Sequence, residues 1–477
     1  MVVGEIVEER DLVIIGGGPG GYHAAIRAAQ LGLKVTIIEK DDLGGVCLTK
    51  GCIPSKLFAT SAVKMEELKD LKKFGIHLDG AHFDLDVLHK EKESTIDQLK
   101  KGVQGLLQSN DIECIKGSAY FLSNDRLGVE HEHSFMVYRF TSAIIATGST
   151  REAVQAVDHI RVLDCESIYT VKEIPNHLIV YGDDYLALEV ATTFRQLGSN
   201  VSILLSEGKH NFSFDSSINK ELMRQLKKKG IKILKGMSLK SVNQQDDVHV
   251  QTENEKMEES TLQGSHIYLT TKTVPNTTHL GIDRLEMKRD ESDHLVTDEK
   301  CQTSINGIYA VGDVTMGPSL AVKAIKQGKV AAESIAGHAT EMDPFFIPTV
   351  IHTNPPMAFV GLTEEQANEQ YEEVNTAEFP LGGNGFATVI GKRDGLVKVV
   401  IDAKTDLILG IHMIGHGAVE LASTSALALE MVARTEDLTF MHYPHPSMNE
   451  GLLEAVEALT GKAIHLSANK QVKESVT

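Results

Sequence analysis

The stretch DLVIIGGGPGGYHAAIRAAQLGLKVTIIEK, residues 11–40, decides the fold of this chain. The apolar run at 12–15 predicts a strand, GGGPGG a tight turn, and the alanine-rich segment 22–31, with apolar residues at helical spacing, a helix. KVTIIEK then predicts a second strand that ends at Glu39. Strand, glycine turn, helix and strand in this order are typical of a βαβ unit, so we expect an α/β fold.

The turn carries the pattern G-x-G-x-x-G at Gly16, Gly18 and Gly21, and Glu39 follows 18 residues after the last glycine. Glycines at these positions permit a tight turn and let backbone amides approach a pyrophosphate at a helix N-terminus. An acid at the end of the next strand accepts a hydrogen bond from a ribose hydroxyl. The unit therefore predicts a dinucleotide site.

The same rhythm returns later in the chain. Residues 177–208 again read strand, turn, helix and strand, which predicts a second dinucleotide-binding unit. The apolar segment 140–150 predicts a strand, and Asp313 lies between an apolar strand and an alanine-rich helix. From about residue 348 the pattern changes to strand-like alternation and two apolar helices. We expect two Rossmann-like domains and an α+β C-terminal domain.

Bulk composition excludes several classes of function. A chain of 477 residues is too long for one core, and its 42% hydrophobic and 24% charged residues are ordinary for a globular protein. The net charge of -19 argues against nucleic acid or an anionic membrane as the main partner. The N-terminus lacks the pattern of a secretory signal, and five cysteines do not suggest an extracellular disulfide framework. We therefore expect a cytoplasmic protein.

GGVCLTKGCIPSK, residues 44–56, places Cys47 and Cys52 five positions apart among glycines. Three interpretations are open for this pair: two buried thiols, half of a metal site, or a redox-active disulfide beside a cofactor.

Three stretches together resemble the flavoprotein disulfide reductases. Residues 44–56 are similar to that family's active-site segment G-G-T-C-L-N-x-G-C-I-P-S-K, and YAVGDV (309–314) resembles its second flavin motif. HPSMNE (445–450) resembles the H-P-T-x-x-E of its interface domain. The order of these motifs covers essentially the full chain. Within the family, AAIRAAQLGLKVTIIEK and TNPPMAFVGLTEEQA are most similar to the dihydrolipoamide dehydrogenases.

The resemblance implies an FAD-binding domain in two parts (1–150 and 280–347), an NAD-binding-like domain (151–279) and an interface or dimerisation domain (348–477). It implies no metal. The residues that it implies for cofactor binding are Gly16, Gly18, Gly21, Glu39, Lys56, Ala119, Gly148, Gly182, Glu189, Asp313 and Ala321.

The resemblance also implies a redox-active disulfide, with Cys47 exchanging with a substrate dithiol and Cys52 facing the flavin. Residues five apart on an ideal helix point about 140° away from each other, so a bridge needs an irregular backbone, which Gly51 and Pro54 supply. A metal site is disfavoured because no C-x-x-C or matching histidine pair lies nearby. We expect buried thiols at the three other cysteines, Cys114, Cys165 and Cys301.

A base is needed to deprotonate the incoming thiol, because the thiolate is the nucleophile. The resemblance implies His445 as this base, with Glu450 orienting its imidazole. In the family this pair reaches the disulfide of the other subunit, so a twofold homodimer is implied. Lys56 and Glu189 are implied to form an ion pair near the flavin.

The second βαβ unit departs from the family's pattern for NAD at three points. Its turn reads GDDYLA (182–187), so Asp184 stands where a glycine lets the backbone approach the pyrophosphate. The acid that would hold the NAD ribose aligns with Leu205. The family's G-R-x-P-N segment is KTVPN (272–276), in which the glycine and the arginine are both lost and Lys272 stands at the first position. NAD binding is therefore in doubt.

The leading hypothesis is an FAD enzyme that oxidises dihydrolipoamide or a related dithiol with NAD+, the dithiol being carried on a lipoyl domain of a 2-oxoacid dehydrogenase complex. The alternatives are a disulfide or quinone reductase with a drifted nicotinamide site, and a non-catalytic interaction subunit that keeps the fold. Retention of both cysteines, His445 and Glu450 argues against the non-catalytic alternative.

Overall fold

The computed structural model describes residues 7–152, 160–244, 246–343 and 345–467, and the chain divides into two compact units. The first unit contains Met1–Leu57, Asp86–Gln155 and Thr271–Pro344; the second contains Phe58–Leu85, Ala156–Thr270 and Phe345–Thr477. The finer division into four segments stays a prediction. Over the four described ranges, no helix has the length and apolar character needed to cross a membrane.

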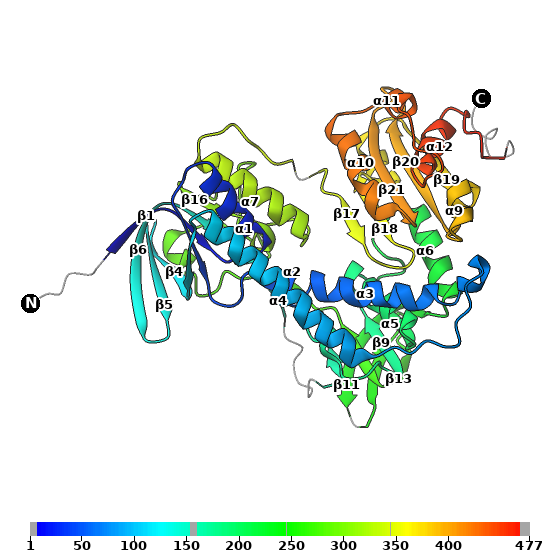
Figure 1. Cartoon of the computed structure of the whole chain (residues 1–477), viewed down its shortest axis with the longest axis horizontal. Helices are drawn as coiled ribbons and strands as arrows, with labels where there is room; N and C mark the ends of the chain where they lie inside the picture. Colours follow the sequence, from blue (N-terminus) through cyan, green and yellow to red (C-terminus); the bar gives the residue numbers. More distant parts are fainter. Residues whose placement is uncertain (1–6, 153–159, 245, 344, 468–477) are drawn as a thin grey trace, which may run out of the picture. The chain divides into compact units, whose positions relative to one another are not determined.

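A seven-stranded sheet forms the centre of the first unit, in the order β3-β2-β1-β6-β5-β4, with β16 paired to β6 (Figure 1). Strand β1 pairs in parallel with β2 and β6, and its residues Leu12, Val13 and Ile14 have no exposed surface. A central parallel strand is covered on both faces, which explains the continuous apolar run in the sequence. The strands are β1 (Val7–Ile15), β2 (Val35–Glu39), β3 (Glu113–Lys116), β4 (Ser118–Ser123), β5 (Arg126–His131), β6 (Ser134–Ile145) and β16 (Ile308–Ala310).

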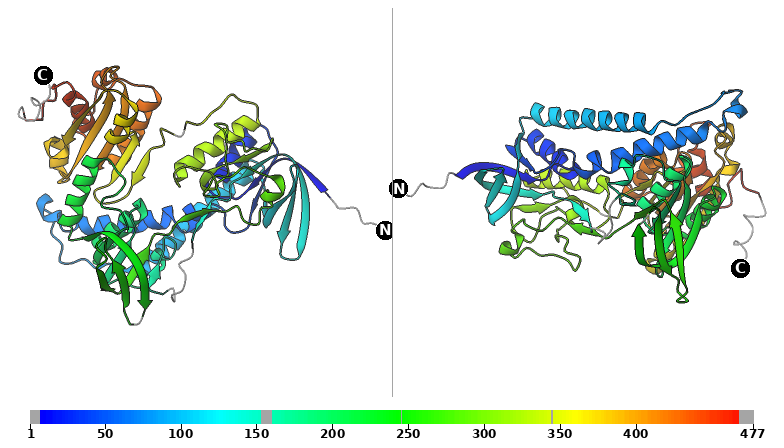
Figure 2. Two further views of the ribbon diagram at one scale, coloured as in Figure 1. Left: turned by 180° about the vertical axis from the view of Figure 1, so that it is seen from behind. Right: turned by 90° about the horizontal axis from the view of Figure 1, so that it is seen from below.

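Helices α1 (Pro19–Gln30) and α7 (Ala321–Ile335) pack against each other in the first unit, blue beside yellow-green in Figures 1 and 2. Their backbones approach so closely that a Cβ on Gly328 would lie 2.3 Å from the carbonyl oxygen of Gly20. Arg27 and Glu333 form an ion pair at 2.7 Å between the same helices. Both helices predicted from alanine-rich segments are thus confirmed. The long helix α4 (Leu85–Ser109) also belongs to the first unit, apart from its first residue.

The second unit contains the repeated βαβ motif. Its elements β9 (His177–Tyr181), α5 (Tyr185–Gln196) and β10 (Asn200–Ser206) come in the predicted order, and β9 pairs with β10 in parallel. They belong to a sheet in the order β13-β12-β11-β10-β9-β14-β8. The remaining elements are β8 (Val162–Leu163), α6 (Ser216–Lys228), β11 (Lys232–Gln244), β12 (Val248–Glu253), β13 (Glu259–Gly264) and β14 (His266–Leu269).

A five-stranded antiparallel sheet, β17-β18-β21-β20-β19, completes the second unit and confirms the α+β character of the C-terminal region. Alternate residues of β20, Val397 and Val399, pack in one core with Leu421 of α10 and Leu452 of α12. The elements are β17 (Thr349–Ile351), β18 (Met357–Gly361), α8 (Glu364–Gln370), β19 (Val374–Pro380), α9 (Gly385–Val389), β20 (Gly395–Asp402), β21 (Ile408–Gly415), α10 (Ala418–Glu430), α11 (Thr435–Phe440) and α12 (Glu450–Ala458).

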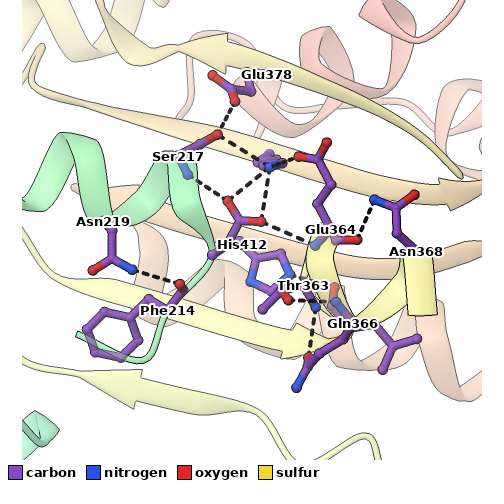
Figure 3. Close-up of polar contacts among 12 residues, drawn as sticks. Phe214, Ser217, Asn219, Thr363, Glu364, Gln366, Asn368, Glu378 and His412 are labelled. Atoms are coloured by element: carbon purple, nitrogen blue, oxygen red, sulfur yellow. Dashed lines mark hydrogen bonds and ion pairs between the residues drawn. The ribbon is translucent and has the colours of Figure 1, made fainter. Parts of the chain in front are cut away.

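The other face of β20 carries a buried charge. Lys398 is 1% exposed, and its ammonium donates to the carboxylate of Asp215 at 3.0 Å, which is itself fully buried. The ammonium also contacts Glu364 and donates to the Ser217 hydroxyl at 3.3 Å, so its hydrogen bonds are satisfied (Figure 3). Asp215 caps α6 through the backbone N–H of Ser217 at 2.9 Å. This network joins the five-stranded sheet to the N-terminus of α6.

Candidate active site

The three glycines of the first turn lie in different surroundings. A Cβ on Gly16 would lie 2.3 Å from the Ala146 carbonyl oxygen, and one on Gly21 would lie 1.9 Å from the Gly16 oxygen. Gly18, the N-cap of α1, is different, because its nearest neighbour in that direction is the Gly45 Cα at 3.9 Å. A Cβ is therefore excluded by packing at Gly16 and Gly21, whereas at Gly18 it would make only an ordinary contact.

Glu39 ends β2 beside this turn, as predicted. Its Oε2 accepts from the Gly17 N–H at 2.6 Å, and its Oε1 accepts from the Asp41 N–H at 2.7 Å. These two bonds fix the carboxylate at the strand end, where an acid can accept from a ribose hydroxyl.

The predicted disulfide is present between Cys47 and Cys52, whose Cα atoms are 4.7 Å apart. Cys47 lies in the short helix α2 (Gly45–Thr49), and Cys52 begins α3 (Cys52–Glu67). The helical path is broken between them at Lys50 and Gly51, which brings the two sulfurs together as the sequence predicts. Both cysteines are partly exposed, so a substrate thiol can approach.

Two glycines hold the disulfide segment against the glycine turn, a contact that the sequence reasoning missed. The Gly44 N–H donates to the Gly17 oxygen at 2.8 Å, and a Cβ on Gly45 would lie 2.8 Å from the Gly18 Cα. Both residues have positive φ, 95° and 60°, which favours glycine. The signal for this contact was the GG pair that precedes Cys47 by two residues.

Asp313 and Ala321, two further residues predicted to bind the cofactor, lie in elements of the first unit that contact each other. Asp313 follows β16 and accepts from the Ser149 hydroxyl at 3.3 Å, and burial raises the pKa of its carboxyl above the usual value. Ala321 is the first residue of α7. Burial lowers the pKa of Lys323 on the same helix, whose ammonium donates to the Thr315 carbonyl at 3.1 Å.

Gly148 and Ala119 occupy different environments. Gly148 has φ +67° with open space around its Cβ direction, and its carbonyl accepts from the Asn276 N–H at 2.9 Å. The Asn276 side chain also donates to the Thr147 carbonyl at 2.9 Å, a positioning role that the sequence reasoning missed although VPN is retained. Ala119 is buried in β4 and packs in the core of the first unit. Its contact with a cofactor stays a prediction.

His445 and Glu450 form the predicted pair at the start of α12. His445 Nδ1 lies 2.8 Å from Glu450 Oε1, and the Ser447 N–H donates to Glu450 Oε2 at 2.9 Å. Burial alone would raise the pKa of Glu450, but these hydrogen bonds outweigh it and hold the pKa below its usual value. The imidazole is 81% exposed, so its Nε2 is the nitrogen that is accessible to a thiol.

Two predicted groupings extend across the two units and stay predictions. The disulfide belongs to the first unit, whereas His445 and Glu450 belong to the second. Lys56 and Glu189 are likewise divided between the units. Within the second unit, Glu189 is 2% exposed and accepts from the His352 N–H at 2.8 Å.

The second glycine turn keeps the backbone of the first. The Gly16 N–H donates to the Ile38 carbonyl at 2.8 Å, and the Gly182 N–H donates to the Leu204 carbonyl at 3.0 Å. Ile38 and Leu204 are therefore equivalent positions, and so are the residues that follow them. Leu205 thus stands where the first unit has Glu39. Gly182 has φ +148°, and a Cβ there would lie 1.6 Å from the Thr270 hydroxyl oxygen, so its glycine is required by packing.

The side chains of the second turn differ from those of the first. Asp184, the N-cap of α5, accepts from the Ala187 N–H at 2.8 Å. Leu205 has no exposed surface. Lys272 directly precedes β15 (Thr273–Pro275), which pairs with β7 (Ser149–Arg151). Its carbonyl accepts a hydrogen bond from the Glu152 N–H at 2.9 Å. The residues present thus fit a dinucleotide at the first turn and do not fit one at the second.

The prediction of three buried thiols is wrong for two of them. Cys301 is buried, and desolvation raises its pKa to about 12. Cys114 is exposed because β3 is the edge strand of its sheet, and Cys165 is only partly buried.

Residues 10–328 match the family described as pyridine nucleotide-disulphide oxidoreductase, and residues 347–456 match its dimerisation domain. The dihydrolipoyl dehydrogenase of Geobacillus stearothermophilus is 36% identical over 98% of this chain and 99% of its own. That of Bacillus subtilis is 37% identical over 98% of this chain and 100% of its own. The crystal structure of LpdA from Mycobacterium tuberculosis has a TM-score of 0.88 at 26% identity, covering 94% of this chain and 99% of that one.

Proposed function

This chain belongs to the pyridine nucleotide-disulphide oxidoreductase family, and from that premise we propose that it is an FAD-dependent dithiol–disulfide oxidoreductase of the dihydrolipoyl dehydrogenase type. The observation that carries the proposal is the partly exposed Cys47–Cys52 disulfide packed directly on the first glycine turn. The proposed substrate is a dihydrolipoyl dithiol, carried on a lipoyl domain of a 2-oxoacid dehydrogenase complex. A cytoplasmic location stays a prediction.

The disulfide chemistry follows from thiol–disulfide exchange. A substrate thiolate attacks Cys47 Sγ, the bond to Cys52 breaks, and Cys52 leaves as a thiolate. The second substrate thiolate then attacks the substrate sulfur bound to Cys47, which releases Cys47 and closes the substrate disulfide. Two electrons pass from the dithiol to the cysteine pair, and the two substrate protons are released to bases.

His445 is the proposed first base. Its Nδ1 is directed at the Glu450 carboxylate, so the imidazolium formed when Nε2 takes a thiol proton faces a negative charge at 2.8 Å. Glu450 is held by the Ser447 N–H and lies in the first turn of α12, where the helix dipole favours a carboxylate. Glu450 therefore orients the imidazole with Nε2 directed away from the carboxylate, as proton transfer from a thiol requires.

The first unit is the proposed FAD site. The N-terminus of α1 above Gly18 would hold the pyrophosphate, and Glu39 would hold a ribose hydroxyl. When bound, FAD would supply a two-electron acceptor for the reduced cysteine pair. The other residues proposed to contact it are Gly16, Gly21, Lys56, Ala119, Gly148, Glu189, Asp313 and Ala321.

We also propose a homodimer in which His445 serves the disulfide of the partner. The dimerisation-domain match covers residues 347–456, and His445 is highly exposed in the single chain. Large apolar side chains of the same region are exposed to solvent, among them Met431, Val432 and Phe440 at 71%, 65% and 88%. Exposed apolar side chains gathered in one region favour a protein interface.

The test is anaerobic mixing of the FAD-loaded protein with dihydrolipoamide, followed by titration of free thiols and by the flavin spectrum. We expect two new protein thiols, at Cys47 and Cys52, and reduction of the flavin. An intact disulfide and an unchanged spectrum after prolonged mixing would reject the proposal and favour the non-catalytic alternative.

A further inference from the structure

We infer that Asp184 closes the second dinucleotide site of this chain, acting as a built-in competitor of the pyrophosphate, so that nicotinamide dinucleotides bind at least about tenfold more weakly than an intact turn would allow. The inference rests on the proposed function, because it concerns the acceptor side of that reaction. It makes Asp184 and Leu205 the residues that determine the chain's affinity for NAD+ and NADH.

A hydrogen bond from the Asp184 side chain closes the N-terminus of α5. Asp184 Oδ1 accepts from the Ala187 N–H at 2.8 Å, and this N–H is the third of α5. The free N–H groups of the first turn are what make a helix N-terminus attract a pyrophosphate. In α1 the equivalent N-cap is Gly18, which has no side chain to compete. The N-cap position of the helix thus carries no side chain in the first unit and carries a carboxylate in the second.

The second turn also carries negative charge that the first turn lacks. Two carboxylates, Asp183 and Asp184, replace two glycines of the first turn. The Ser206 hydroxyl donates to Asp183 at 2.8 Å, and the Lys209 ammonium lies 3.6 Å from the same carboxylate. The Asp183 and Asp184 side chains place carboxylates where the first turn offers a bound pyrophosphate only backbone dipoles, and like charge disfavours an anion there.

The position that would bind the ribose has also lost its acid. Leu205 occupies the position of Glu39, is fully buried and has no polar atom to accept from a ribose hydroxyl. The nearest acid in the chain, Glu207, accepts from the Ser238 hydroxyl at 2.8 Å. Loss of a charge-assisted hydrogen bond costs about tenfold or more in affinity. The pyrophosphate and ribose contacts are therefore both weakened.

The backbone of the turn argues that the loss can be repaired. Gly182 keeps its positive φ and its hydrogen bond to the strand-end carbonyl, as Gly16 does in the first unit. The site is closed by side chains on a retained backbone, so two substitutions should reopen it.

Direct binding to the full-length FAD-loaded protein tests the inference, measured by isothermal titration with NAD+, NADH and ADP-ribose. Asp184→Gly combined with Leu205→Glu should tighten binding of all three by at least about tenfold, because it restores the pyrophosphate and ribose contacts. Asp184→Asn separates the two effects: it keeps a capping oxygen without the charge and should fall between the unmodified protein and Asp184→Gly. Leu205 is fully buried, so if Leu205→Glu prevents folding, Asp184→Gly alone should still tighten binding, because glycine is an accepted N-cap.

Thr363→Gly is the matched control, because it removes the side-chain cap of α8 in the same unit and should leave dinucleotide affinity unchanged. Low-micromolar binding of NADH by the unmodified protein, or no tightening in the double variant, would overturn the inference. Reduction of the disulfide by dihydrolipoamide is measured separately, so failure of the proposed function and failure of this inference give different results.

Discussion

The two βαβ units of this chain share a backbone and differ in the side chains placed on it. In both, a glycine N–H bonds to the carbonyl at the end of the neighbouring strand, and a helix starts three residues after that glycine. The first unit then has Gly18 and Glu39, and the second has Asp184 and Leu205. The comparison teaches that the fold of a dinucleotide domain does not by itself make a dinucleotide site. Binding depends on a few side chains that the backbone tolerates either way.

The largest effect is expected at the disulfide beside the first turn. Cys47→Ser and Cys52→Ser should each reduce dithiol oxidation to background, because exchange requires both sulfurs. Absorbance spectra of the FAD-loaded variants distinguish the two roles. Cys47→Ser should show a long-wavelength band from the Cys52 thiolate against the flavin, and Cys52→Ser should lack it. The opposite pattern would reverse the proposed assignment.

His445→Gln should lower dithiol turnover by about 10² to 10⁴, the usual contribution of a positioned acid–base group. His442→Gln, at another exposed histidine in the same loop, is the matched control and should have little effect. Mixing His445→Gln with Cys47→Ser subunits under exchange should restore activity if each site uses residues of both chains. No restoration in verified mixed dimers would argue against the shared site.

The two acidic N-caps of the second unit, Asp215 of α6 and Asp184 of α5, should differ in how much they contribute to the free energy of unfolding. Lys398→Met leaves the buried Asp215 carboxylate without its ammonium and should destabilise the protein by about 3–5 kcal/mol. Lys69→Met, which breaks an exposed pair with Glu66, should cost about 1 kcal/mol or less. Asp184→Gly should cost only about a few tenths of a kcal/mol, because glycine is itself an accepted N-cap. Urea unfolding of the three variants measures these differences, and equal losses would contradict the distinction.

The Asp215 carboxyl also makes a pH prediction. Burial alone would raise its pKa, but Lys398 outweighs burial and holds the pKa below the usual value. The stability from this group is therefore fully present above about pH 4 and is lost as the pH falls through the lowered pKa. In Lys398→Met the burial of Asp215 is no longer offset, so the difference in stability between this variant and the unmodified protein should narrow as the pH falls below about 4. A difference that stays constant over this range would show that the lysine does not control this carboxyl.

The smallest effects are expected at the thiols outside the disulfide. Burial raises the pKa of Cys301 to about 12, whereas Cys114 is exposed on the edge strand β3. Iodoacetamide near neutral pH should label Cys114 well before Cys301, because the thiolate is the reactive form. Peptide mass spectrometry measures the order, and early labelling of Cys301 would contradict its burial.

Local patterns in the sequence predicted both βαβ units and the break between Cys47 and Cys52. The resemblance to the family implied the pairing of His445 with Glu450, which lies five residues away. The alignment of Leu205 with Glu39 also follows from the repeat alone. The buried Lys398 was not predicted, because its partner Asp215 is 183 residues away and alternation in a strand does not identify charges. The exposure of Cys114 was missed for a similar reason, since the position of β3 at the sheet edge depends on the whole sheet order.

The same limit applies to the second turn. The sequence identified a carboxylate at Asp184 as an obstacle to the pyrophosphate, but not the hydrogen bond that it accepts from the Ala187 N–H. That bond depends on the side-chain orientation at the N-cap. Because of this bond, Asp184 not only repels a pyrophosphate but also takes up an N–H group that the pyrophosphate would use.

Anaerobic stopped-flow reduction of the unmodified FAD-loaded protein, by dihydrolipoamide and by NADH in separate experiments, tests the contrast between the two units most directly. We predict rapid reduction of disulfide and flavin by dihydrolipoamide. With NADH we predict slow reduction whose rate keeps rising with concentration well beyond the micromolar range, because binding at the second turn is weak. Rapid reduction by NADH that saturates at low micromolar concentration would contradict the account.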